Sequence, residues 1–311
     1  MKKVLLLIVF SLTFWSCKNT AIINPDTDVD DGDLEISDIL ISEILPDPQK
    51  GGVEFVEIYN NSTRLIDLNS LQLATMNSTG KRSKLHSISS STVFIYPFTY
   101  KLLSLDSEIV QAHYSVPDKT ALHTMASFPT LTNSQGAVIL FSDEKPIDSL
   151  YYTAGLHDVF IKDPKGVSLE RVSFSKPTNS TGNFISAAAT AGYATPGYQN
   201  SQLENKEKVT QTIFLSSKIF NPDREEQLEI SFNFNQGGKM ANIFIFNSEG
   251  KKIRNLVTNH RLGTKDRIFW NGEDDKKELL PVGVYLLSIE IYDAEGNFKK
   301  YKESCVLASK I

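Results

Sequence analysis

The residues of this chain that could perform acid–base or nucleophilic chemistry are few and scattered. No H-E-x-x-H, G-x-S-x-G or phosphate-binding glycine-rich motif is present. The five histidines lack metal-ligand spacing: His86, His113, His123, His157 and His260. A catalytic triad can assemble from residues far apart in a sequence, so that alternative stays open. The sequence therefore predicts no catalytic residue, no metal site and no cofactor, and we expect a protein that is not an enzyme.

Cys17 has the most specific surroundings of any reactive residue. It ends a segment with two lysines, an apolar stretch over residues 4–15 and the small residue Ser16, the order found in secretory signal peptides. The apolar stretch is shorter than the roughly 20 residues of a bilayer-spanning helix. The segment resembles a bacterial lipoprotein signal, which implies removal of residues 1–16 and acylation of Cys17. An ordinary signal peptide that ends near a cysteine is the alternative.

The lipoprotein signal implies an exported protein, held to the bacterial outer membrane by acyl chains on Cys17, on its periplasmic or its outer face. Removal of residues 1–16 takes away two lysines and lowers the net charge from −5 to −7. Nonspecific nucleic-acid binding requires clustered Lys and Arg, so we expect no nucleic-acid partner. An envelope protein or a glycan is the expected partner, and its identity does not follow from the sequence.

The second cysteine, Cys305, lies in an apolar-alternating stretch near the C-terminus. If Cys17 carries lipid, Cys305 has no intrachain partner, and a buried, inert thiol is its expected state. A Cys17–Cys305 disulfide in an oxidising compartment is the alternative.

Residues 17–37 are expected to form an acidic, flexible tether, because they carry many aspartates and few large apolar groups. Taken as a calcium-binding loop that begins at Asp26, the segment has Asp31 where glycine is needed and Ser37 where glutamate is needed. A solvated spacer is therefore the preferred interpretation.

From residue 38 onward the pattern is that of strands. Short apolar and β-branched runs alternate with turn-forming residues over 38–200 and again over 211–311, and a polar stretch at 201–210 separates the two regions. The runs include 92–96, 100–104, 213–215 and 267–270, and hairpin turns are expected at 237–238, 249–250 and 295–296. This predicts an all-β protein with two immunoglobulin-like β-sandwich domains in tandem, joined by a linker at 201–210. One short helix is expected at 106–113, with Ile109 and Val110 facing inward.

The first region resembles the lamin tail domain, an immunoglobulin-like sandwich that also occurs in bacterial secreted proteins. The matching segments are ISEILPDP (41–48), VEFVEIYNNS (53–62), IDLNSLQLA (66–74) and the stretch 168–202, which contains the closing phrase ATPGYQN (194–200). Tyr193 and Tyr198, which flank part of that phrase, could stack on a sugar ring. Closing the last strand of the domain is the alternative for both.

The second region resembles the immunoglobulin-like C-terminal domain of flagellar hook-capping proteins. The matching segments are 219–234, 241–256, 269–290 and 292–300, and the P-x-G-x-Y element is intact at 281–285. The resemblance implies an assembly or spacer fold. Acidic turns at 223–226 and 273–275 could hold a cation, but solvated turns are preferred because the first turn lacks the Asp/Gly pattern of the family. Trp270 is expected in the core of this domain, under Tyr285 and Ile289.

These observations lead to one functional expectation and two alternatives. We expect a lipid-anchored cell-envelope protein with a non-enzymatic binding, adhesion or scaffolding role. The first alternative is an accessory module of an envelope-associated nuclease or phosphatase system. The second is a secretion-sorting role for the C-terminal domain.

Overall fold

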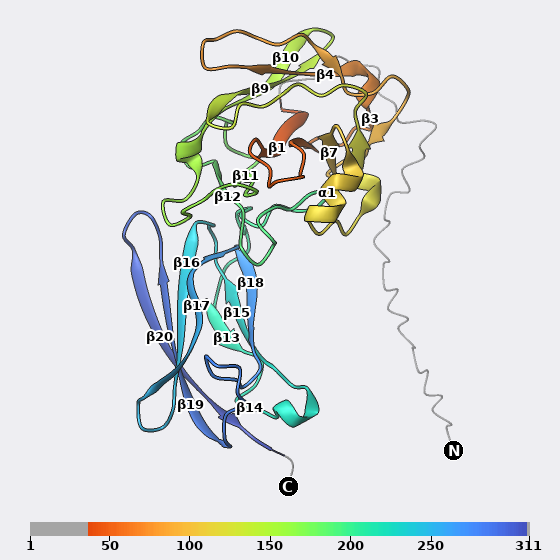
Figure 1. The fold of residues 1–311 in the computed structure, drawn as a ribbon. Coiled ribbons are helices and arrows are strands. Elements are labelled where there is room, and N and C mark those ends of the chain that lie inside the picture. The colour runs from red at the N-terminus through yellow and green to blue at the C-terminus, as the bar shows by residue number, and fades with distance from the viewer. Residues whose placement is uncertain (1–36, 310–311) are drawn as a thin grey trace, which may run out of the picture.

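The computed structural model describes residues 37–309, and Cys17, the predicted signal and nearly all of the tether lie outside the described residues. The described chain is built mainly from antiparallel strands, in sheets packed in two pairs that lie end to end (Figure 1); β7–β8 and β14–β20 are parallel pairs. This confirms the all-β class and the tandem of two β-sandwiches. Among the described residues, no helix is both long and apolar enough to cross a bilayer.

The first sandwich pairs a six-stranded sheet with a four-stranded sheet. The larger sheet has the order β12-β11-β1-β2-β7-β8, with bounds Phe184–Ser186, Leu169–Arg171, Ile39–Leu45, Phe55–Asn60, Tyr100–Ser104 and Leu122–Thr124. The smaller sheet has the order β10-β9-β4-β5, with bounds Lys145–Thr153, Gln135–Ser142, Leu71–Met76 and His86–Ser87. A short ribbon joins β3 (Ile66–Asp67) to β6 (Phe94–Ile95).

The main core of this sandwich lies between its two sheets. Alternate apolar side chains of β1 and β2 meet those of β4, β9 and β10 there, including Ile41, Ile58, Leu73 and Leu140. The six-stranded sheet is also covered on its opposite face. There Phe55 packs edge-on against Tyr114, with ring centroids 6.1 Å apart, in a second apolar cluster. Strand β1 is consequently buried along both faces.

The predicted helix is present as α1 (Ser107–His113) and belongs to that second cluster. The Asp106 carboxylate caps it by accepting hydrogen bonds from the backbone N–H groups of residues 108 and 109. Val110 is buried as expected, whereas Ile109 is only partly buried. Single 3₁₀ turns occupy four further positions: η1 (Leu68–Ser70), η2 (Lys119–Ala121), η3 (Ala154–Leu156) and η4 (Pro222–Arg224).

The second sandwich pairs a three-stranded sheet with a five-stranded sheet. The smaller has the order β13-β15-β18, with bounds Ile213–Leu215, Leu228–Asn233 and Lys265–Trp270. The larger has the order β14-β20-β19-β16-β17, with bounds Ile219–Phe220, Phe298–Leu307, Gly283–Tyr292, Lys239–Phe246 and Lys252–Leu262. The expected hairpin turns at 249–250 and 295–296 join paired strands.

The predicted hairpin turn at 237–238 is wrong. Strands β15 and β16 belong to different sheets, so these glycines lie in a connection between the sheets. Gly238 has a φ of +84°, which a residue with a side chain rarely adopts. A Cβ on Gly237 would meet the side-chain oxygen of Gln202 at 2.4 Å, so this glycine is needed for a close approach of two segments.

Trp270 is fully buried at the centre of the second core, as the sequence predicts. Its ring packs edge-on against Tyr285 and Phe220, with centroids 5.7 and 5.4 Å away, and its indole N–H donates to the Glu273 carbonyl at 2.9 Å. Cys305 lies in the same core with its thiol free, and burial raises its pKa to about 12. The expectation of a buried thiol is therefore confirmed.

The segment that the sequence marks as a linker begins inside a hydrogen-bonded junction between the sandwiches. The Gln202 side chain donates to the Leu262 carbonyl at 3.0 Å and accepts from the Gly238 N–H at 2.9 Å. The Ser201 carbonyl accepts from the Thr264 N–H at 2.9 Å. Residues 201 and 202 thus join the two sandwiches directly, and the separate folding of the two domains stays a prediction.

Candidate functional site

Three buried glutamates form the most unusual group of side chains in the described structure. Glu43 of β1 lies directly opposite Glu170 of β11 and Glu57 of β2 in the strand register. The three carboxyls therefore line up across neighbouring strands on one face of the sheet, and none of them is exposed to solvent. We call Glu43, Glu57 and Glu170 the glutamate row.

The glutamate row binds the backbone of the segment 194–202, which covers it. Glu43 accepts a hydrogen bond from the Thr195 N–H at 3.0 Å, and Glu57 accepts one from the Gly197 N–H at 2.6 Å. Glu170 accepts from the Gln202 N–H at 2.9 Å. The carboxyls thus provide acceptors for a segment that has no strand partner, and they fix its path over the sheet.

Burial and mutual repulsion favour the neutral forms of these carboxyls. Burial, followed by the charge of Glu170, raises the pKa of Glu43 to about 8. Burial raises the pKa of Glu170 to about 7. Burial and the charge of Glu43 raise the pKa of Glu57 well above its usual value. Around the row, burial and the charges of these carboxyls also raise the pKa values of Tyr100, Tyr114 and Tyr198.

Hydrogen-bond geometry independently places a proton on the row. The Thr195 hydroxyl lies 3.1 Å from Oε2 of Glu43 and 2.9 Å from Oε1 of Glu170. One hydroxyl carries one proton, so it can donate to only one of the two carboxyls. A protonated Glu43 satisfies both contacts, because it donates to the Thr195 oxygen while Thr195 donates to Glu170.

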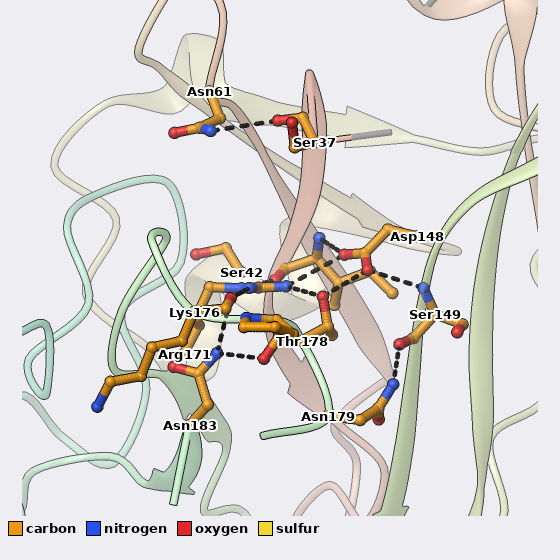
Figure 2. Close-up of polar contacts among 12 residues, drawn as sticks. Ser37, Ser42, Asn61, Asp148, Ser149, Arg171, Lys176, Thr178, Asn179 and Asn183 are labelled. Atoms are coloured by element: carbon orange, nitrogen blue, oxygen red, sulfur yellow. Dashed lines mark hydrogen bonds and ion pairs between the residues drawn. The ribbon is translucent and has the colours of Figure 1, made fainter. Parts of the chain in front are cut away.

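A second buried polar group, shown in Figure 2, locks the two sheets of the first sandwich together. Arg171 of β11 donates to the Ile41 carbonyl at 2.6 Å and forms an ion pair with Asp148 of β10 at 3.1 Å. Asp148 in turn accepts from the Ile41 N–H at 2.8 Å. The register of β1 with β2 shifts between Ile41 and Glu43, and these side chains bind the backbone of Ile41 beside that bulge.

Asn179, in the loop between β11 and β12, covers part of the outer edge of the four-stranded sheet. The Asn179 side chain accepts from the Tyr151 N–H at 2.8 Å and donates to the Ser149 carbonyl at 2.7 Å (Figure 2 shows the second of these bonds). Strand β10 has no strand partner on that side. One amide side chain therefore takes the place of a neighbouring strand.

Three of the five histidines have hydrogen-bonding partners within the fold. His86 contacts the Ser127 hydroxyl at 2.8 Å, and His123 contacts the Ile88 carbonyl at 2.8 Å. His157 contacts the Ser186 hydroxyl at 3.0 Å, and burial lowers its pKa to about 4. Burial also lowers the pKa of His260. Among residues 37–309, no group of three His, Cys, Asp or Glu side chains has the arrangement of a metal site.

Acidic residues of both turns accept hydrogen bonds from backbone amides, within the turn or on a neighbouring strand. Asp274 accepts from the N–H groups of residues 276 and 278, and Asp275 accepts from the Asn255 N–H at 2.8 Å. In the first turn, Glu226 accepts from the Asn221 N–H at 2.7 Å. These bonds engage Asp274, Asp275 and Glu226 with backbone amides, and the interpretation of both segments as solvated turns stays a prediction.

Two cavities flank the junction between the sandwiches. One, of about 580 Å³, is lined by groups that include the buried ion pair Arg261–Asp158 and the pair Lys239–Asp293. The other, of about 460 Å³, lies between the segment 190–201 and strand β18 and is lined by Tyr198 and Phe269 among others. We call the second one the β18 cavity. Both volumes fall within the roughly 300–1,000 Å³ of small-molecule sites.

No protein-family model matches the chain, and no curated protein matches its sequence. The two family resemblances therefore rest on the quoted motifs alone. Similar solved structures include CopC from Methylosinus trichosporium OB3b, at 18% identity over 31% of this chain and 94% of that chain, with a TM-score of 0.20.

Two further similar structures come from Porphyromonas gingivalis. Dimeric latent PorU shares 8% identity over 88% of this chain and 20% of its own length, with a TM-score of 0.27. PorZ, an essential bacterial surface component of the type-IX secretion system, shares 12% identity over 86% of this chain and 38% of its own, with a TM-score of 0.26. The chain thus spans a minor part of both, and similarities this weak carry no argument about its function.

Proposed function

We propose that this protein is a lipid-anchored protein of the cell envelope with a non-enzymatic binding or scaffolding role. The observation that carries the proposal is the junction that joins the two sandwiches. Three kinds of contact cross it. They are the two hydrogen bonds of the Gln202 side chain, the bond from the Ala189 N–H to the Arg261 carbonyl at 3.0 Å, and the Arg261–Asp158 ion pair. Two domains that reorient freely about a linker would not need such bonds. A rigid spacer, or a binding site with a wall from each domain, would need them.

The orientation of the chain supports the same role. The proposed anchor precedes the first sandwich, and the second sandwich with the C-terminus lies on the far side of the junction (Figure 1). A rigid junction would therefore hold the second sandwich away from the point of attachment.

The buried polar groups also support a role without catalysis. The glutamate row binds backbone, and Arg171 and Asp148 bind the backbone of β1. Each group is thus engaged in holding the fold. Purified protein is expected to hydrolyse no generic nuclease, phosphatase, protease or glycosidase substrate, and activity that disappears with a single histidine replacement in a folded variant would contradict this.

The anchor is tested with the two cysteines as a matched pair. Cells that express the wild type, Cys17→Ala or Cys305→Ala are labelled with a palmitate analogue and fractionated. We expect label and detergent partitioning in the wild type and in Cys305→Ala, and loss of both in Cys17→Ala. Unchanged membrane association of Cys17→Ala would refute the anchor.

A further inference from the structure

One wall of the β18 cavity is a strand face with an unusual composition. The side chains of β18 alternate, so that Lys265, Arg267 and Phe269 point to one side while the residues between them are buried. Phe269 is 49% exposed although Trp270, its neighbour in sequence, is fully buried. These three residues line the β18 cavity, so this face of the strand forms one of its walls.

The opposite wall is the segment that the glutamate row holds in place. Tyr198 and Gln199 line the cavity from this side. The neighbouring Gly197 and Asn200 are fixed, the first by Glu57 and the second by a 3.0 Å bond from its amide to the Ser42 carbonyl. The Gln199 side chain is exposed and makes no hydrogen bond to another described residue. Two aromatic rings and a free amide thus face one open space from two rigid walls.

The acidic residue of the β18 cavity is hydrogen-bonded within the fold, whereas its two basic residues are only weakly paired. Asp266 is fully engaged, because it accepts from the Thr190 hydroxyl at 2.6 Å, the Gly263 N–H at 2.8 Å and the Arg267 N–H at 2.7 Å. Lys265 pairs with the exposed Glu207 at 3.2 Å, and Arg267, itself exposed, lies 3.9 Å from the half-buried Glu229. Exposed ion pairs of this kind contribute about 0–1 kcal/mol, so both cations remain available to an anion.

We propose that the β18 cavity binds an acidic saccharide. The apolar C–H face of a sugar ring stacks on Phe269 or Tyr198, its carboxylate pairs with Arg267 and Lys265, and its hydroxyls bond to Gln199. Two cations suffice for one carboxylate of a sugar, whereas a nucleic acid would require the clustered Lys and Arg that this acidic chain lacks. The inference deepens the binding role proposed above and rests on it.

The test uses trigalacturonate as the acidic saccharide, maltotriose as the neutral one and tricarballylate as an acid without a sugar ring. Binding to the full-length protein purified in detergent is measured by calorimetry and by saturation-transfer NMR. We expect trigalacturonate to bind, and the other two probes to bind at least roughly tenfold more weakly because each lacks one part of the recognition. Equal binding of either control, or no binding of trigalacturonate, would overturn the proposal.

Variants assign the binding to the cavity. Phe269→Ala and Arg267→Gln should each weaken trigalacturonate binding by roughly tenfold, whereas Phe269→Tyr keeps a ring and should retain it. Phe298→Ala and Lys302→Gln remove an exposed ring and an exposed cation from β20, away from the β18 cavity, and should change nothing. Unaltered affinity in both Phe269→Ala and Arg267→Gln would refute the site. Cys17→Ala should bind normally, so failure of the anchor and failure of the cavity give different results.

Discussion

Replacing Glu43 by glutamine is the sharpest test of the glutamate row. Glutamine has the shape of a protonated glutamate, and its amide can donate to the Thr195 hydroxyl as a protonated Glu43 would. The variant therefore fixes the row in the state that the hydrogen bonds favour, without the pH dependence that a titrating carboxyl brings.

The sign of the effect follows from the raised pKa. The pKa of Glu43 is about 8 in the folded protein and 4.5 in the absence of the fold. Between these values the folded protein holds a proton that the unfolded chain has released, so the free energy of unfolding of the wild type falls as the pH rises. At roughly 1.4 kcal/mol for each pH unit, the full interval corresponds to a loss of about 5 kcal/mol. The free energy of unfolding of Glu43→Gln should fall much less over the same pH interval.

The assay is urea unfolding followed by circular dichroism from pH 5 to pH 9, together with hydrogen exchange of the segment 194–202. We expect the two proteins to differ little at pH 5 and the variant to be several kcal/mol more stable at pH 9. Protection of the Thr195 and Gly197 amides, corrected for intrinsic exchange, should fall with pH more steeply in the wild type than in the variant, in which Glu57 and Glu170 still titrate. Glu290→Gln on β19 is the control. Parallel pH profiles for the wild type and Glu43→Gln would refute the shared proton.

Four further results are expected. Trp270→Ala should destabilise the second sandwich by about 3–5 kcal/mol in chemical denaturation, because it leaves a cavity in a packed core. A loss below about 1 kcal/mol would contradict that packing. Arg171→Met should cost about 3–5 kcal/mol and the double variant with Asp148→Ala less than the sum of the single variants, since one partner alone leaves a buried charge; strict additivity would argue against the pair. Cys305 should resist a thiol reagent in the native protein and react on unfolding, so rapid native labelling would contradict its burial. The fragments 38–200 and 211–308 should each unfold cooperatively, and two fragments without a thermal transition would show that each sandwich depends on the junction.

The strands could be predicted from the sequence because apolar alternation is a local property. The stretches Tyr100–Ser104 and Ile213–Leu215 were predicted with the bounds that the structure shows, and the helix after Asp106 follows from its capping residue. The strand predicted at 92–96 is reduced to β6, because only residues 94 and 95 pair with β3. Local pattern thus predicts elements well where a strand is paired along its whole length.

The glutamate row could not be predicted in this way. Each glutamate alternates with apolar residues, the pattern of a strand with one solvated face, and that pattern predicts an exposed side chain. Burial comes from the segment 194–202, which returns from more than 100 residues away to cover Glu43 and Glu57. One signal was present, because Glu43, Glu57 and the covering segment all lie within the motifs that carry the lamin tail resemblance.

The β18 cavity could not be predicted from the sequence either, because its two walls come from segments far apart in the chain. Tyr198 was a candidate for sugar stacking from its place in the closing phrase, but Phe269 was hidden beside Trp270 in a predicted core strand. Only the junction between the sandwiches brings the two rings to one cavity. The partner of a surface ring is a property of the assembled chain, so the residues around Phe269 carry no local signal of it.

If the protein is anchored through acyl chains on Cys17, as we propose, the capping of β10 by Asn179 affects how neighbouring copies meet on the membrane. Anchored proteins diffuse in two dimensions and meet one another edge to edge far more often than the same number of molecules in solution. An open strand edge there would invite neighbouring copies to add on strand by strand. By occupying the Tyr151 N–H and the Ser149 carbonyl, a single amide keeps this edge from acting as a template, so that crowding on the bilayer need not lead to sheet-to-sheet polymerisation.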